Sequence, residues 1–547
     1  MRIPVSLLFL VLAVQAVPAQ DAGVPHLEKR GVTTQLIVGG KPFLMLAGEL
    51  NNSSSSSLDY MRPIWPKLAA NSLNTVLTPI SWELVEPTEG KFDFALIDGL
   101  LAQAREQHLH IVFLWLASWK NGMSSYPPLW VKQDTKRFPR VISSGEETAI
   151  LTPIDNAARD ADARAFAAVM HHLGEVDARD HTVLMMQVEN EVGVLGDTRD
   201  RSPEANRLFA SAAPAELMQY LTSHTDSLDP EFRALWDVNG DKASGTWAEV
   251  FGDPVRADEI FMAWHYSRYV NAVAAKGKAA YNIPMYVNTW LPGAGDKPGN
   301  YPSGGPQPRV LDIWKAGGTA LDFYSPDLYA ADFAGWSNRY HRAGNPLFIP
   351  ETHSGAEGAA NVFYAVGEQS ALGFSPFGID GALMRGTIAE PAVPGPPPAR
   401  TPPDLATSYK VIAQLSPLLE EAQAKGNVHG FVLDKDHPSA DFNMGGFMVH
   451  VSLDSIFGFH SDSGFGLVMA TGPGELIGAG MGFRVSFTAS APGQQHVALA
   501  SVDEGRFEAG KWIPGRRLNG DENDQGNYWR FDPRQIKTEK ALVYKFD

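Results

Sequence analysis

The feature that most constrains the fold is a set of short apolar runs that alternate with longer amphipathic stretches from about residue 36 onward. Most of the runs are apolar throughout, as strands that are buried on both faces should be. The stretches between them are typical of helices, since apolar residues recur at helical spacing in 93–108, for example. The runs cover 43–48, 74–80, 110–116, 182–188, 284–290, 320–328, 346–350 and 371–378.

Eight strands that are each followed by a helix predict a (β/α)8 TIM barrel. The alternative is a doubly wound open sheet, but no G-x-G-x-x-G motif follows the first run, so a dinucleotide site has no support. The Pro-rich stretch 391–403 is either a domain linker or a long loop after strand eight. We favour the loop, because 404–425 after it has the apolar spacing of an eighth barrel helix. The barrel is therefore expected over residues 36–425.

The two ends of the chain differ from this pattern. After residue 426, short strand-like runs are separated by Gly, Asp, Ser and Asn, which predicts a smaller, sandwich-like all-β domain over 426–547. Residues 1–19 have the charged start, apolar run and small final residue of a secretory signal peptide, with a buried N-terminal strand as the alternative. No later run reaches the ~18 apolar residues of a membrane span. We expect an exported bacterial protein, periplasmic or extracellular, with no membrane association in the mature form.

The composition excludes several classes of function. The chain has 0 Cys, which rules out disulfides, a thiolate nucleophile and an iron–sulfur site. Its net charge of −17 argues against nucleic acid and anionic membranes as partners. No histidines have the H-E-x-x-H spacing, so we expect no catalytic metal and no cofactor. No sequence feature sets the oligomeric state.

Carboxylates stand at the ends of two buried strands, where the functional groups of such barrels lie. The fourth run ends in Gln187-Val188-Glu189-Asn190-Glu191, and the seventh is followed directly by Glu351. Two carboxylates that face each other across a barrel mouth are suited to glycoside hydrolysis, one as acid/base and the other as nucleophile. The alternative is that they form salt bridges at the barrel rim. For Glu189 that structural role is as plausible, because its side chain should point opposite to that of Asn190.

The fourth-strand segment 187–191 resembles glycoside hydrolase family 35, the β-galactosidases, and the Asn190-Glu191 and Glu351 positions resemble the wider clan of retaining β-glycosidases. The segment 82–94, WELVEPTEGKFDF, is similar to the W-x-x-x-E-P-x-x-G-x-F stretch after strand two in that family and in a sister galactosidase family. The resemblance implies that Glu191 is the acid/base, that Glu351 is the nucleophile and that Asn190 holds the sugar 2-hydroxyl.

The chain departs from the family pattern at two positions. Where many members have a Tyr in strand two and a carboxylate before the Trp after strand three, this chain has Pro79 and Ser118. Both family side chains contact galactose, so the sugar is less firmly implied than the mechanism. The tract 48–53, GELNNS, resembles a bacterial branch of the family, and we hypothesise that Glu49 replaces the missing carboxylate.

Further candidates lie at the remaining strand ends. Asn288 ends strand five, while Asp327 and Tyr329 end strand six. By resemblance to the clan, Tyr329 orients the nucleophile. Separately, Trp119 is a candidate stacking platform for a sugar ring. Core packing is the alternative for both residues.

The function that the resemblance implies is a retaining exo-β-galactosidase, which releases terminal β-D-galactosyl residues from oligosaccharides or plant cell-wall polysaccharides. Two alternatives stay open. One is a retaining β-glycosidase of the same clan with another sugar specificity, and the other is a non-catalytic glycan-binding protein.

Overall fold

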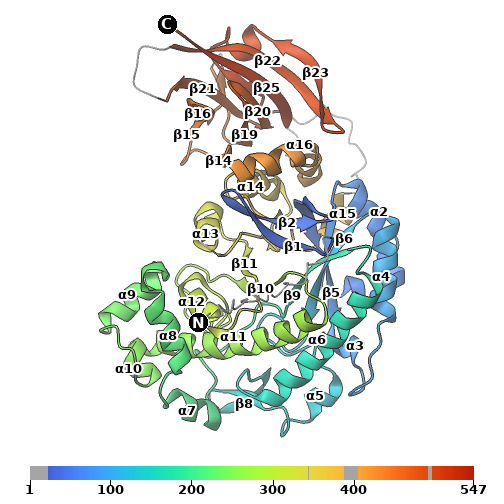
Figure 1. Ribbon diagram of the computed structural model, residues 1–547, viewed down its shortest axis with the longest axis vertical. Helices are drawn as coiled ribbons and strands as arrows, with labels where there is room; N and C mark the ends of the chain where they lie inside the picture. Colours follow the sequence, from blue (N-terminus) through green and yellow to red (C-terminus); the bar gives the residue numbers. More distant parts are fainter. Residues whose placement is uncertain (1–22, 343, 387–403, 457, 491–495) are drawn as a thin grey trace, which may run out of the picture.

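The eight buried runs form one parallel sheet that closes into a barrel in the computed structural model of this chain (Figure 1). Neighbouring strands in the sheet follow the order of the chain, and a parallel bridge between Ile349 and Phe374 joins the seventh strand to the eighth. The predicted (β/α)8 barrel is confirmed, and the sequential order excludes a doubly wound sheet. Its strands are β4 (Met45–Glu49), β5 (Thr75–Ser81), β6 (His110–Leu116), β9 (Val183–Val188), β10 (Met285–Trp290), β11 (Phe323–Leu328), β12 (Glu351–Thr352) and β13 (Gly373–Phe374).

The structure describes residues 23–342, 344–386, 404–456, 458–490 and 496–547. The predicted signal peptide and the Pro-rich stretch 391–403 therefore lie outside the described residues. Among those that are described, no helix is both long enough and apolar enough to cross a membrane.

Helices cover the outside of the barrel, as the amphipathic stretches predict. One helix for each barrel strand lies between that strand and the next or after the last strand, and turns its apolar face toward the sheet. These helices are α2 (Trp65–Ala70), α4 (Ala95–Glu106), α6 (Asn156–Val176), α11 (Pro254–Ala280), α12 (Leu311–Gly317), α13 (Phe333–Tyr340), α14 (Ala356–Gly367) and α16 (Leu405–Lys425).

The barrel interior is a packed core rather than a channel. Side chains from the strands meet there, with the rings of Tyr286, Phe323 and Phe348 against one another. A three-stranded sheet of β1 (His26–Arg30), β2 (Thr33–Val38) and β3 (Lys41–Pro42) adds Leu36 to this core. The acidic side chains of the barrel strands lie at the carboxyl ends of those strands.

Two excursions from the barrel were not predicted. An antiparallel hairpin of β7 (Arg140–Ser143) and β8 (Glu146–Leu151) follows β6 and the short helix α5 (Leu129–Gln133). After β9 the chain forms α7 (Pro203–Phe209), α8 (Ala215–Ser223), α9 (Pro230–Val238) and α10 (Trp247–Phe251) before it reaches α11. Both excursions enlarge the rim at the carboxyl ends of the strands.

The C-terminal part is a two-sheet β-sandwich, as expected. One sheet has the order β14-β19-β20-β25-β22-β23, and the other has the order β15-β16-β21-β24. A separate apolar cluster, which includes Phe483, Trp529 and Phe531, fills the space between the sheets. The strands are β14 (Val428–Leu433), β15 (Ser439–Met444), β16 (Phe447–Leu453), β19 (Gly464–Gly472), β20 (Glu475–Met481), β21 (Phe483–Ala489), β22 (His496–Glu508), β23 (Lys511–Leu518), β24 (Trp529–Phe531) and β25 (Lys537–Phe546).

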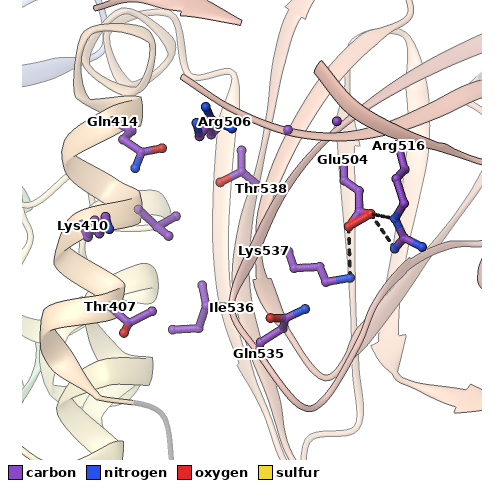
Figure 2. Close-up of a pocket in the computed structure, with 13 residues that line it drawn as sticks. Thr407, Lys410, Gln414, Glu504, Arg506, Arg516, Gln535, Ile536, Lys537 and Thr538 are labelled. Carbon is purple, nitrogen blue, oxygen red and sulfur yellow. Dashed lines mark hydrogen bonds and ion pairs between the residues drawn. The ribbon is translucent and has the colours of Figure 1, made fainter. Parts of the chain in front are cut away.

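Helix α16 lies between the barrel and the sandwich (Figure 1). Its Tyr409 hydroxyl donates to the carbonyls of Ala47 in β4 and Phe374 in β13, at 2.7 and 2.8 Å. On the sandwich side, a cavity of about 400 Å³ separates the helix from β22, β23 and β25 (Figure 2). Glu504 in this cavity pairs with Arg516 and Lys537, so strands β22, β23 and β25 are tied together beside the helix.

Candidate active site

Four carboxyl groups meet at the carboxyl ends of the barrel strands. Glu49 ends β4, Glu191 follows β9, Asp327 lies near the end of β11 and Glu351 begins β12. All four side chains are buried. Carboxylate oxygens of Glu191, Asp327 and Glu351 lie within 4.8 Å of one another. Strands that are far apart in the sequence therefore deliver acidic groups to one point, as the alternation of strands and helices predicts.

The backbone after β9 explains how adjacent residues face opposite ways. Glu189 and Glu191 both have left-handed backbone angles, with φ of 62° and 45°, which costs ~1–3 kcal/mol per non-glycine residue and is typical of functional sites. Glu189 points away from the mouth, and its carboxylate accepts from the backbone N–H groups of Ser118 (3.1 Å) and Trp119 (2.8 Å). Asn190 and Glu191 point into the mouth. Glu189 thus has a structural role, but it fixes the backbone after β6 rather than forming the rim salt bridge that was the alternative for it.

Glu191 is held by two amides. Its backbone N–H donates to Asn288 Oδ1 at 2.9 Å, and Asn121 Nδ2 donates to its Oε2. Burial, and then the negative charge of Glu351, raise the pKa of the Glu191 carboxyl to about 7. A carboxylic acid with such a pKa can be protonated and deprotonated near neutral pH, which is what a general acid/base requires.

Glu351 accepts hydrogen bonds on both carboxylate oxygens. The Tyr329 hydroxyl donates to Oε2 at 3.1 Å, and Asn190 Nδ2 lies 3.4 Å from Oε1. Burial, and then the Glu351 charge, raise the pKa of the Tyr329 phenol, so that it remains a donor. Hydrogen bonds of this kind favour an ionised carboxylate with a fixed orientation, as a nucleophile needs.

Lys120 and Asn121 also enter the mouth, and the sequence analysis missed them. Lys120 Nζ donates to Asn190 Oδ1 at 3.0 Å. Burial lowers the pKa of Lys120, but the negative charges of Glu351, Glu191, Glu49 and Asp327 outweigh it and raise the pKa overall. The ammonium is therefore charged. The available signal was position, since both residues come just after the third apolar run.

Glu49 is fully buried, and neither carboxylate oxygen has a hydrogen-bond partner among the described residues. Burial, and then the charge of Glu351, raise its pKa well above the ordinary value. The loop after it is fixed, because Asp380 accepts from both the backbone N–H and the side-chain amide of Asn51. An unpartnered acid beside the paired carboxylates is a candidate to bind a polar ligand.

One expectation about this region needs correction, namely Trp119 as a stacking platform. Trp119 is fully buried, donates its indole N–H to the Leu151 carbonyl and packs against the edges of Tyr266 and Tyr269. It presents no face to a ligand, so we leave it out of the candidate sugar site. Ser118 also points outward, with its hydroxyl bonded to Asp162 and Tyr269, because its backbone is held by Glu189.

Aromatic side chains at the rim come from other strand ends. Trp290 at the end of β10 is 38% exposed and Tyr329 after β11 is 39% exposed. The His353 ring packs edge-on against Tyr329 at 5.1 Å between centroids. Exposed aromatic faces beside buried polar groups are what a sugar ring requires, since its faces are apolar and its edges carry hydroxyls.

The same carboxylates are the one place in the described part of the chain where three metal-ligating side chains converge, namely Glu191, Asp327 and Glu351. The charged Lys120 ammonium faces all three. A cation there would meet this positive charge at short range in a buried setting, so the residues do not fit a metal site well.

Comparison with known proteins bears on the barrel. Residues 65–248 match the family model of glycoside hydrolase family 42, described as "Beta-galactosidase". Over that segment the barrel is similar to glycoside hydrolases of the β-galactosidase type. The family 35 assignment is not confirmed, because the model that matches is that of the sister galactosidase family. Residues 405–530 match a domain of unknown function, DUF5597.

One relative is a β-galactosidase from Xanthomonas manihotis, which is 27% identical over 232 residues. The match covers 40% of this chain and 35% of that protein, so the chain spans about a third of the relative's length. Two solved structures are similar. A β-galactosidase from Rahnella sp. R3 has a TM-score of 0.40 and 16% identity over 61% of this chain and 50% of that one. A β-galactosidase from Marinomonas ef1 has a TM-score of 0.43 and 13% identity over 69% and 60%.

Within the matched segment, the W-x-x-x-E-P-x-x-G motif has a structural role. The buried carboxylate of Glu86 accepts from the Trp82 indole at 2.8 Å, from the Gly90 backbone at 2.7 Å and from Arg164 at 3.2 Å. Gly90 has a φ of 74°, which favours glycine. The motif residues therefore bind one another and fix the turn that leads into α4, rather than a ligand.

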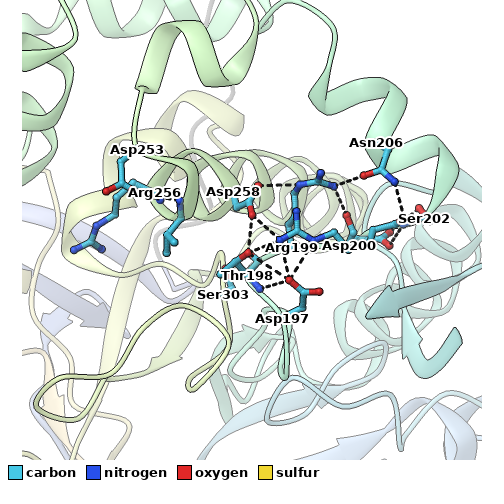
Figure 3. A network of polar contacts seen from close by, with 12 residues as sticks. Asp197, Thr198, Arg199, Asp200, Ser202, Asn206, Asp253, Arg256, Asp258 and Ser303 are labelled. Carbon is cyan, nitrogen blue, oxygen red and sulfur yellow. Dashed lines mark hydrogen bonds and ion pairs between the residues drawn. The ribbon is translucent and has the colours of Figure 1, made fainter. Parts of the chain in front are cut away.

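The loop that carries Glu191 is anchored by a network of buried ion pairs (Figure 3). Asp258 in the first turns of α11 accepts from Arg199 Nε, Arg201 Nη2 and the Thr198 hydroxyl, at 2.8, 2.8 and 2.6 Å. Ser303 donates to the Thr198 carbonyl at 2.6 Å, which joins this loop to the one after β10. The network holds the chain that follows Glu191 in one position.

Proposed function

We propose that this chain is a retaining exo-β-galactosidase that removes terminal β-D-galactosyl residues from oligosaccharides or plant cell-wall polysaccharides. The observation that carries the proposal is the approach of Glu191 and Glu351, whose carboxylate oxygens lie within 4.8 Å at the carboxyl ends of the strands. Retaining enzymes hold their two carboxyl groups ~5–5.5 Å apart, whereas inverting enzymes need ~6.5–9.5 Å to admit a water. The separation therefore favours double displacement.

In the first half-reaction, the ionised Glu351 attacks the anomeric carbon while Glu191 gives its proton to the glycosidic oxygen. The sugar becomes an ester of Glu351, and the rest of the substrate leaves as an alcohol. The pKa of about 7 supports Glu191 as the acid. The hydrogen bonds from Tyr329 and Asn190 support Glu351 as the ionised partner.

In the second half-reaction, Glu191 takes a proton from water, which attacks the anomeric carbon and releases Glu351. Once Glu351 is esterified, its negative charge no longer raises the pKa of Glu191. The pKa of Glu191 then falls, so that the same residue can act as the base. One electrostatic contact thus supports both roles.

The sugar would be bound by groups that surround this pair. Asn190 would hold the 2-hydroxyl, while Glu49 would accept and Lys120 would donate hydrogen bonds to further hydroxyls. Asn288 would act through Glu191, whose backbone it holds. A galactoside is favoured by the match to the β-galactosidase family model and to a β-galactosidase relative. Another β-glycoside remains the second candidate, because Pro79 and Ser118 differ from the family 35 pattern.

The domain limits and the location belong to the same proposal. We place the signal peptide at 1–19, the catalytic barrel at 36–425 and the accessory β-domain at 426–547. Export to the periplasm or the cell exterior would suit an enzyme whose substrate is a polysaccharide too large to enter the cell. An enzyme with a net negative charge and an uncharged substrate needs neither nucleic acid nor a membrane as a partner.

The first test is hydrolysis of a panel of p-nitrophenyl glycosides by the mature chain, beside Glu351→Gln and Glu191→Gln. We expect turnover of the β-galactoside, loss of turnover in Glu351→Gln, and a first product with the β configuration by proton NMR. Turnover of a different sugar would retain the mechanism and reject galactose. An α product would reject double displacement. No turnover on any glycoside, with glycan affinity retained, would favour the non-catalytic binding protein.

A further inference from the structure

A third acid, Asp327, lies inside the candidate site without a role in the two-carboxylate mechanism. Its side chain is 2% exposed, and an oxygen of it lies within 4.8 Å of both Glu191 and Glu351. Asn288 Nδ2 donates to Oδ2 at 2.7 Å, whereas Oδ1 has no hydrogen-bond partner among the described residues. Asn288 also accepts from the Glu191 backbone, so that one amide fixes Asp327 relative to Glu191.

The charges around Asp327 do not permit three ionised carboxylates. The facing groups are three carboxyls, one ammonium and three phenols, namely Glu49, Glu191, Glu351, Lys120, Tyr286, Tyr329 and Tyr340. Lys120 is the one cation among them. Like charges at this separation in a buried site exclude one another, so a proton must be retained.

Glu49 has no donor on either oxygen, and Glu191 gives up its proton in the first step, so the hydrogen-bond donors must indicate whether Asp327 or Glu351 also retains a proton. One oxygen of Glu351 accepts from the Tyr329 hydroxyl, and the other lies near the Asn190 amide. The Glu191 carboxylate accepts from the Asn121 amide. Asp327 receives a donor on one oxygen only, and its other oxygen is buried with none. A neutral acid is satisfied by that arrangement if its O–H donates to a neighbouring carboxylate, and an oxygen of Glu191 lies within 4.8 Å of Asp327.

We propose that Asp327 stays protonated throughout the reaction and donates a hydrogen bond to Glu191, as a positioning residue for the acid/base. The proposal rests on the proposed function of Glu191. The Asp327 proton is not transferred: in the first half-reaction the proton comes from Glu191, and in the second it comes from water. The Asp327 hydrogen bond stabilises the ionised form of Glu191, which is the product of the first step and the base of the second.

Two substitutions distinguish a protonated Asp327 that donates a hydrogen bond from an ionised Asp327. The amide of Asp327→Asn can accept from Asn288 and donate to Glu191, as the protonated acid does, so the alkaline limb of kcat/KM should keep its position whatever the rate. Asp327→Ala removes the donor, and that limb should move to higher pH by about half a unit or more. If Asp327 were ionised, Asp327→Asn would remove a negative charge and move the limb to lower pH, and the proposal would be wrong. An unmoved limb in Asp327→Ala would also overturn it.

An infrared measurement tests the proton without relying on turnover. The difference spectrum of wild type minus Asp327→Asn at neutral pH should contain the C=O band of a protonated carboxylic acid. A difference that contains only carboxylate bands would overturn the proposal. Because this readout needs no substrate, it still decides the state of Asp327 if the chain hydrolyses no glycoside and the proposed function fails.

Discussion

Glu191 has to be an acid in one step and a base in the next, and its surroundings set the pH range in which it can be both. Burial and the Glu351 charge raise its pKa to about 7. The acid form is the one that begins the reaction, so kcat/KM should fall as pH rises through about 7. In Glu351→Gln the second cause of the shift is gone, and the pKa of Glu191 should move down toward its ordinary value. Carbon-13 NMR of labelled glutamate side chains in wild type and variant would measure both values, and an unchanged Glu191 signal would contradict the electrostatic coupling.

Lys120 should tune Glu191 in the opposite direction. Its positive charge lowers the pKa of Glu191 and orients Asn190. Lys120→Met keeps much of the buried stem but removes the charge, so the pKa of Glu191 rises and the alkaline limb of kcat/KM moves to higher pH. Loss of one fixed donor should also lower kcat/KM by roughly 10²-fold. Lys132→Met is the matched control, since Lys132 lies on α5 and pairs with Glu83 outside the mouth. Equal pH profiles for the two variants would reject the role of Lys120.

Part of the site could be predicted from the sequence, and the limit is physical. Glu191 follows the buried strand β9, and Glu351 follows the apolar run 346–350 and begins β12. A carboxylate in such a buried setting is costly unless it is used. Lys120 and Asn121 follow a strand by four and five residues, after a turn whose direction depends on Glu189 holding the backbone of Ser118 and Trp119. That contact joins residues about 70 positions apart, so local spacing could not show which side chains enter the mouth.

At the level of elements, the loop between β9 and α7 is bound to α11, so the position of that helix helps to fix the position of Glu191. Asp258 neutralises Arg199 and binds Arg201, both in a largely buried setting. Asp258→Asn removes the charge and leaves the buried Arg199 guanidinium without its acid, while Arg201 keeps its ion pair with Asp197. The loss should lower the free energy of unfolding by about 3 kcal/mol. Because the anchored loop continues from Glu191, kcat should fall more than KM rises.

Another acid on the same helix provides the control for this experiment. Asp253 is exposed and caps the N-terminus of α11 by accepting from Val255 and Arg256. Asp253→Ala should cost about 1 kcal/mol of stability through the lost cap, with kcat retained. Calorimetry and steady-state kinetics on the three proteins check both effects. A kcat loss in Asp253→Ala as large as in Asp258→Asn would mean that general destabilisation, rather than the loop, is responsible.

The same scale shows why some elements were predicted and others were not. The eight barrel strands are buried on both faces and therefore read as continuous apolar runs. Helices α7 to α10 are short, and β8 has polar or exposed residues over much of its length. Neither the helices nor the strand therefore has a repeating pattern of apolar residues long enough to predict it. Their positions are fixed by tertiary contacts such as the Ala212–Thr246 bridge, which no local pattern contains.

At the scale of the whole molecule, the apolar cluster of the barrel extends onto one sheet of the sandwich, beside the sandwich's own cluster. Phe363 of α14 packs against Phe465 of β19 with centroids 5.4 Å apart, and both belong to the cluster that includes Ile412 and Leu415 of α16. Since apolar contact runs from barrel to sandwich without interruption, the two parts should unfold together. Calorimetry of the wild type should give a single transition, and two resolved transitions would contradict this coupling.

Strand β14 of the sandwich contacts helix α14 of the barrel, and we call this contact the seam. A substitution in the seam tests whether the two domains unfold together because of it. A Cβ on Gly430 of β14 would lie 2.2 Å from the Phe363 carbonyl oxygen and 3.0 Å from Gly367 Cα, so that neither backbone can yield without the domains moving apart. Gly430→Ala should therefore lower the free energy of unfolding by about 1–3 kcal/mol and separate the calorimetric transition into two. Gly472→Ala is the control in the same domain, because its Cβ would meet nothing nearer than Glu475 Cβ at 3.7 Å. If both variants melt as the wild type does, the seam does not couple the domains, and the sandwich is an independently stable module.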